Sequence, residues 1–167
     1  MSPFRSERGA AGPGAIAGGT ILCLLVAFFV TVLLPITDSA NRDAANGKPH
    51  TYDQVALNGR SLYIREGCFE CHTQQVRNTF SDSGLGPAPS EAGLYKNEAP
   101  NLIGVIRFGP DLTCFGDRAG EPAAIVRHLR NPEAVHHDST MPHYSYLTTK
   151  ELQALAAYLL RLRCKEG

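Results

Sequence analysis

The stretch Cys68-Phe69-Glu70-Cys71-His72 places two cysteines three positions apart and a histidine directly after the second. This Cys-x-x-Cys-His pattern is the attachment signature of a c-type haem. The two thiols form thioether bonds to the haem vinyl groups, and the histidine becomes the proximal ligand of the iron. The motif therefore predicts one covalent haem c, held by Cys68 and Cys71, with His72 on the iron.

Two other kinds of site use a Cys-x-x-Cys pair. A zinc site needs a second ligand pair at similar spacing, whereas the other cysteines, at positions 23, 114 and 164, are isolated. A thioredoxin-like redox pair needs a surrounding βαβ unit, and the sequence does not show that pattern. Haem is therefore the favoured interpretation. A disulfide between Cys114 and Cys164 is an alternative to two separate buried thiols, and separate thiols are preferred.

The composition argues against a nucleic-acid partner. Among 167 residues, Lys plus Arg and Asp plus Glu each number 16, so the formal net charge is zero, whereas nucleic-acid binding favours a basic excess. The 16 glycines and 11 prolines, with no tryptophan, are typical of a loop-rich domain with a modest core.

Residues 15–36 contain no charged side chain. As a helix they would span about 33 Å, which is enough to cross the hydrocarbon core of a bilayer. We expect a retained transmembrane anchor here, with residues 1–14 as a cytoplasmic tail and residues 37–51 as a linker to a domain over residues 52–167. A cleaved signal peptide is the alternative, but its apolar region would be shorter than this stretch.

The charges beside the apolar stretch give a weak orientation signal, because Arg5 and Arg8 precede it and Arg42 and Lys48 follow it. Bacteria attach haem c outside the cytoplasmic membrane. We therefore expect a single-pass protein of the inner membrane with its haem domain on the periplasmic side.

The domain is predicted to be all-α. A helical pattern starts near Tyr52, with Asp53 as its N-cap, and ends at Gly67, directly before the haem motif. A short helix is expected over residues 121–131, ended by Pro132.

The clearest helical pattern covers residues 148–164, where Thr148 and Glu151 form a capping box. Residues 73–108 contain many glycines and prolines and are expected to be irregular. The first helix of the domain leads into the haem motif, and the last helix is expected to cross the first one. This layout resembles that of a class I cytochrome c.

Met141 is the predicted distal ligand. The chain has two methionines, and Met1 would lie on the other side of the membrane. Met141 stands before Pro142, in a loop between two predicted helices, and its soft thioether suits ferrous iron and raises the reduction potential. A bis-histidine haem is the alternative, and four histidines are candidates for it: His128, His136, His137 and His143.

Three more residues are predicted to contact the haem or its ligand. In class I cytochromes, a proline in a segment like Gly109-Pro110-Asp111-Leu112 accepts a hydrogen bond from Nδ1–H of the proximal histidine, which fixes its tautomer. Pro110 is the candidate for this role. Arg77 and Arg107 are candidates to bind a haem propionate through charge-assisted hydrogen bonds; for Arg77 a solvated loop charge is the equal alternative.

The chain resembles subunit II of the cbb3-type cytochrome c oxidases, the membrane-anchored mono-haem subunit. The resemblance covers roughly residues 15–163, and its most specific parts are residues 66–77, 109–112, 128–132 and 141–142. It implies that the chain transfers electrons to the haems of a catalytic oxidase subunit. It also implies that the chain forms one membrane complex with this subunit and with other cytochrome subunits. The sequence offers no copper site, so oxygen reduction would occur in a partner. Residues 78–106 lack the tryptophan and the histidine-rich aromatic run expected of the family.

Other functions are compatible with the haem motif. One alternative is a stand-alone electron carrier tethered to the membrane. Another is the cytochrome c subunit of a nitric oxide reductase. A haem enzyme or gas sensor with an open coordination position is a further alternative. The predicted methionine ligand would close that position, and it therefore favours electron transfer.

Overall fold

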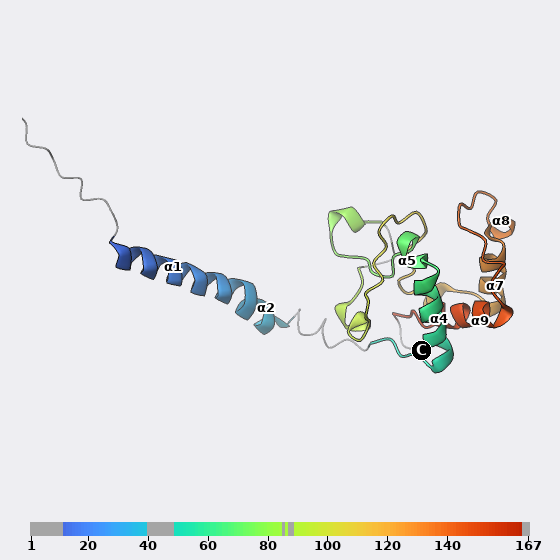
Figure 1. Cartoon of the computed structure of the whole chain (residues 1–167), viewed down its shortest axis with the longest axis horizontal. Helices are drawn as coiled ribbons and strands as arrows, with labels where there is room; N and C mark the ends of the chain where they lie inside the picture. Colours follow the sequence, from blue (N-terminus) through green and yellow to red (C-terminus); the bar gives the residue numbers. More distant parts are fainter. Residues whose placement is uncertain (1–11, 40–48, 85, 87–88, 165–167) are drawn as a thin grey trace, which may run out of the picture. The chain divides into compact units, whose positions relative to one another are not determined.

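The computed structural model describes residues 12–39, 49–84, 86 and 89–164. The chain divides into two compact units, Met1–Asn46 and Gly47–Gly167, and each is described by itself. All regular secondary structure in the described residues is helical (Figure 1). This confirms the all-α prediction.

The first unit contains one apolar helix. It consists of α1 (Pro13–Phe28), a π-helical turn η1 (Phe29–Leu33) and α2 (Leu34–Thr37). The wide turn lies just before Pro35, which has no backbone N–H for the helical ladder, and local π adjustments accommodate such prolines.

The helix over Pro13–Thr37 has 25 residues, and an 18-residue stretch of it has a mean hydropathy of 2.6, so the helix is long and apolar enough to span a membrane. This agrees with the predicted span over residues 15–36. Retention rather than cleavage stays a prediction. The tail was predicted over residues 1–14 and the linker over residues 37–51. Residues 1–11 and 40–48 of these segments lie outside the described residues.

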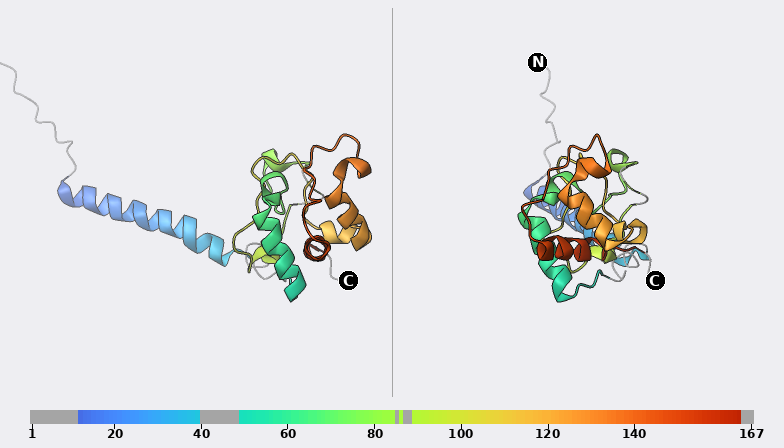
Figure 2. Two further views of the ribbon diagram at one scale, coloured as in Figure 1. Left: turned by 45° about the vertical axis from the view of Figure 1, so that its right-hand side comes forward. Right: turned by 90° about the vertical axis from the view of Figure 1, so that its right-hand side faces the viewer.

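In the second unit, α4 (Gln54–Arg65) packs against α9 (Thr149–Leu159) more extensively than any other pair of helices does. Figure 2 shows α9 lying across α4, with α7 (Pro122–Arg130) beside it. The helices α4 and α9 each bury one apolar face, as the spacing of their apolar residues predicts. The close approach depends on Gly59, because a Cβ there would overlap the carbonyl group of Ala154.

The predicted helix ends are largely confirmed. Asp53 caps α4 by accepting a 2.8 Å hydrogen bond from the amide of Ala56. Thr148 and Glu151 form the expected capping box of α9. The chain leaves α4 through Gly67, whose φ of 69° is a left-handed value that favours glycine. The last helix ends at Leu159, earlier than the predicted residue 164.

Residues 73–108 are irregular, as predicted, apart from two 3-10 turns, η2 (Phe80–Asp82) and η3 (Ala92–Tyr95). Three short helices in the described residues were not predicted: α5 (Cys68–Cys71), α6 (Phe115–Arg118) and α8 (Pro132–Val135). One turn of helix is too short to produce a hydrophobic period. The helix predicted over residues 121–131 is α7, which ends at Arg130, just before Pro132 as expected. Pro132 also begins α8.

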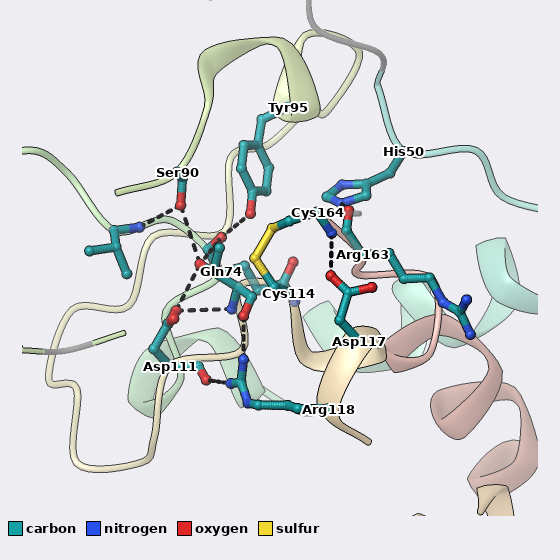
Figure 3. Close-up of a disulfide and its surroundings, with 12 residues drawn as sticks. His50, Gln74, Ser90, Tyr95, Asp111, Cys114, Asp117, Arg118, Arg163 and Cys164 are labelled. Atoms are coloured by element: carbon teal, nitrogen blue, oxygen red, sulfur yellow. Dashed lines mark hydrogen bonds between the residues drawn. A yellow bond between two sulfur atoms is a disulfide. The ribbon is translucent and has the colours of Figure 1, made fainter. Parts of the chain in front are cut away.

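Cys114 and Cys164 form a disulfide (Figure 3), so the preference for two separate buried thiols is wrong. The two cysteines are 50 residues apart in the sequence, and only tertiary contacts bring them together. The Gly116 amide donates to the Leu162 carbonyl at 2.8 Å, and the Cys164 amide donates to the Asp117 carboxylate at 2.8 Å. These contacts hold the chain after α9 against α6.

The crossing of α4 and α9 gives the first prediction. Gly59→Ala places a methyl group on the backbone of Ala154, so it should lower the free energy of unfolding by about 3 kcal/mol, the upper part of the range for overpacking. Gly120→Ala is the matched control, because a Cβ at Gly120 meets no atom within 4 Å. Urea unfolding followed by circular dichroism measures both. Equal stabilities of the two variants would contradict the close crossing.

Candidate haem site

The Cys-x-x-Cys-His motif forms α5 (Cys68–Cys71), a single helical turn directly after Gly67. The amide of His72 donates to the carbonyl of Cys68 at 3.0 Å. Both cysteines are free thiols, Cys68 buried and Cys71 half-buried. Burial raises the pKa of the Cys68 thiol to about 11, whereas redox-active cysteine pairs depend on a lowered thiol pKa. A raised thiol pKa is the opposite of what a redox-active pair requires.

His72 is held by the segment that contains Gly109 and Pro110. Its Nδ1 lies 2.9 Å from the carbonyl oxygen of Pro110, and a carbonyl can only accept, so Nδ1 carries the proton. The lone pair on Nε2 is then left for a metal ion. The contact expected for Pro110 is present, and its effect on a bound iron stays a prediction.

The backbone of Gly109 lies directly against the imidazole ring. A Cβ at this position would overlap Cε1 and also meet Nδ1 at 2.5 Å and Nε2 at 2.7 Å. The amide of Gly109 donates to the carbonyl of Cys71 at 3.1 Å, and this bond ties the segment to the motif. The Tyr63 hydroxyl of α4 donates to the His72 carbonyl at 3.3 Å and ties the motif to that helix.

Met141 is half-buried and packs against the hydrophobic core of the domain. Its backbone amide donates to the hydroxyl of Ser139 at 3.3 Å. The core that it contacts also contains Cys68. The methionine loop and the haem motif thus share one core, as a methionine ligand requires.

The four alternative histidine ligands differ in burial. His128 is half-buried on α7, with its ring centroid 5.5 Å from that of His136. Burial, helped by the nearby charges of His136 and His72, lowers the pKa of His128. His136, His137 and His143 are exposed. All four histidines stay alternatives to Met141.

Arg77 and Arg107 both bind Asp82, a residue that the sequence analysis did not single out. The carboxylate side chain is 0% exposed. It accepts from Arg77 through the backbone amide at 2.8 Å, Nε at 3.0 Å and Nη2 at 2.9 Å. Nη1 of Arg107 lies 2.8 Å from it. Hydrogen bonds from Arg77, and then from Arg107, hold the pKa of Asp82 far below its usual value.

This cluster lines a shallow cavity of about 550 Å³, together with residues 103–105. Part of the hydrogen-bonding capacity of the two arginines is used inside the protein. Their binding of a haem propionate stays a prediction.

Gln74 is a second buried polar residue that the sequence analysis missed (Figure 3). Its carbonyl accepts from the hydroxyls of Tyr95 and Thr113, and its side-chain carbonyl accepts from Tyr158 of α9 at 2.8 Å. These bonds connect the chain just after His72 to the last helix. A glutamine in an irregular segment looks solvent-exposed in a sequence, so no local signal marks it.

A family model described as cytochrome c oxidase, mono-heme subunit/FixO, matches residues 12–163 of the chain. The chain belongs to this family. The match includes the apolar N-terminal helix and every candidate site residue, and it confirms the resemblance that the motifs suggested. No curated protein sequence matches the chain. As a FixO-family member, the protein is the mono-haem subunit of an oxidase complex and has one helix able to span a membrane.

The residues of this FixO-family subunit fit a haem c. Two free thiols stand one helical turn apart, as covalent attachment requires. The adjacent imidazole has its Nδ1 engaged by a carbonyl, which leaves Nε2 for iron. Gly109 leaves the ring just enough space to lie flat against the backbone.

Gly109→Ala tests this packing. The added methyl group overlaps the His72 ring, so the imidazole must move and its bond to Pro110 should be lost. In the haem-loaded chain we expect a partial change from a low-spin to a high-spin absorption spectrum. Gly120→Ala, the same substitution in open space, should leave the spectrum unchanged. A native spectrum for Gly109→Ala would show that the ring does not rest on this backbone.

Proposed function

We propose that the chain is the electron-transfer subunit of a cbb3-type terminal oxidase and delivers electrons to its catalytic subunit. One observation carries the proposal: His72 has its Nδ1 bound to Pro110 beside two free thiols. A bound haem c supplies one-electron redox chemistry. The protein's own part is to hold, orient and enclose that group.

Each site residue has a role in this proposal. Cys68 and Cys71 fix one haem covalently, since the chain has a single Cys-x-x-Cys-His motif. His72 and Met141 would hold the haem iron, and Pro110 would keep His72 in the tautomer that can bind it. With two protein ligands, the iron would have no free position for a substrate. This argues against a haem enzyme or a gas sensor.

The haem domain lies on the extracytoplasmic side in this proposal. The disulfide between Cys114 and Cys164 supports this side, because disulfides persist in the oxidising periplasm and are rare in the cytosol. The apolar helix is the membrane anchor.

The distal ligand can be tested by substitution. Met141→Ala should abolish the near-infrared absorption band that marks a methionine–iron(III) bond, and Met141→His should lower the reduction potential, since a thioether ligand raises it. His128→Ala is the control and should keep the band. Loss of the band in His128→Ala, with its retention in Met141→Ala, would identify His128 as the ligand instead.

The proposed function is tested by the electron acceptor. The complex is purified from native membranes in mild detergent, the haem c is reduced in the absence of oxygen, and its absorbance is followed after oxygen is added. We expect oxidation within the turnover time of the complex, and no fast oxidation when the chain is separated from its partners.

Two results would contradict the proposal. Oxidation by nitric oxide but not by oxygen would indicate a nitric oxide reductase. Recovery of the chain without partner subunits would indicate a stand-alone carrier.

A further inference from the structure

The buried carboxylate of Asp82 connects two loops that are distant in sequence. One loop contains Arg77 and Asp82 itself, and the other contains Arg107. The side chain of Arg107 is only 15% exposed, and its Nε also donates to the carbonyl of Gly104 at 3.0 Å. Arg107 is therefore held at both ends of its guanidinium group.

Arg107 has a backbone conformation that non-glycine residues rarely adopt. Its φ is 57°, in the left-handed region, where a Cβ clashes with the backbone. Such a conformation persists only where surrounding contacts hold it. The bonds to Asp82 and Gly104 are the side-chain contacts that hold it here.

The turn at Arg107 directs the chain to His72. Before the turn, the amide of Ile106 donates to the carbonyl of Glu70 at 2.9 Å. After it, Gly109 lies against the imidazole ring and Pro110 accepts from Nδ1. A relaxed turn would move the Pro110 carbonyl relative to the ring.

We infer that Asp82 is a positioning residue for the haem ligand: it holds Arg107 in its left-handed turn and thereby places the Pro110 carbonyl on Nδ1 of His72. This inference rests on the proposed role of His72 as the proximal ligand. It adds a remote carboxylate to the control of that ligand. Asp82 acts through Arg107 and does not touch His72.

The test measures the His72–Pro110 bond directly. In the haem-loaded full chain, proton NMR follows the exchange of His72 Nδ1–H with deuterium. Asp82→Asn should exchange on the order of fivefold to tenfold faster, as expected when one hydrogen bond is weakened. Arg107→Gln should accelerate the exchange to a similar extent. It loses the ion pair with Asp82, and its Cβ still disfavours the left-handed backbone conformation.

Arg107→Gly separates the turn from the charge. Glycine adopts the left-handed conformation without a holding contact, so this variant should exchange at close to the native rate. Adding Asp82→Asn to Arg107→Gly should then change the rate little. Asp53→Asn is the control: it removes the exposed pair with Arg161, and asparagine still caps α4.

Three outcomes would overturn the inference. Native exchange in Asp82→Asn would show that the carboxylate does not position the ligand. Equal acceleration in Arg107→Gly and Arg107→Gln would show that the turn conformation is not what Asp82 controls. Equal acceleration of the buried Leu155 amide in α9 would mean general destabilisation. Absence of covalent haem in the native chain would instead contradict the proposed function.

Discussion

The structure of the site depends on one hydrogen bond, from Nδ1 of His72 to the carbonyl of Pro110. It fixes the tautomer of the only histidine that follows two free thiols, and so decides which nitrogen is left for iron. The partner is a backbone carbonyl, so its position is set by the path of the chain through Gly109 and not by a side-chain rotamer. That path is in turn anchored by backbone bonds to Cys71 and Glu70.

The rest of the domain supplies a rigid support for this arrangement. The crossing of α4 and α9 at Gly59 fixes the helix that leads through Gly67 into the haem motif. The network around Gln74 ties the chain after His72 to Tyr158 of α9. The motif is therefore connected to α4 through Gly67 and, by way of Gln74, to α9.

Features marked by a few neighbouring residues could be predicted from the sequence, whereas features made by residues far apart in the chain could not. The N-cap at Asp53 and the capping box of α9 are local patterns, so they were predicted correctly. The haem motif is a local pattern too, and covalent attachment at its cysteines stays a prediction. Asp82 was missed because its partners, Arg77 and Arg107, are identified only when two loops come together. The disulfide was missed for the same reason, since 50 residues separate its cysteines. Burial of a polar residue has no local signature in an irregular segment.

Covalent haem attachment at Cys68 and Cys71 is the central claim, and intact-mass spectrometry of the chain from its native membrane tests it most directly. The claim predicts a mass greater than that of the polypeptide by one haem, with the addition on the peptide that contains residues 68–72 after proteolysis. Cys68→Ser with Cys71→Ser should remove the addition. An unmodified mass for the native chain, or an addition on a different peptide, would contradict it.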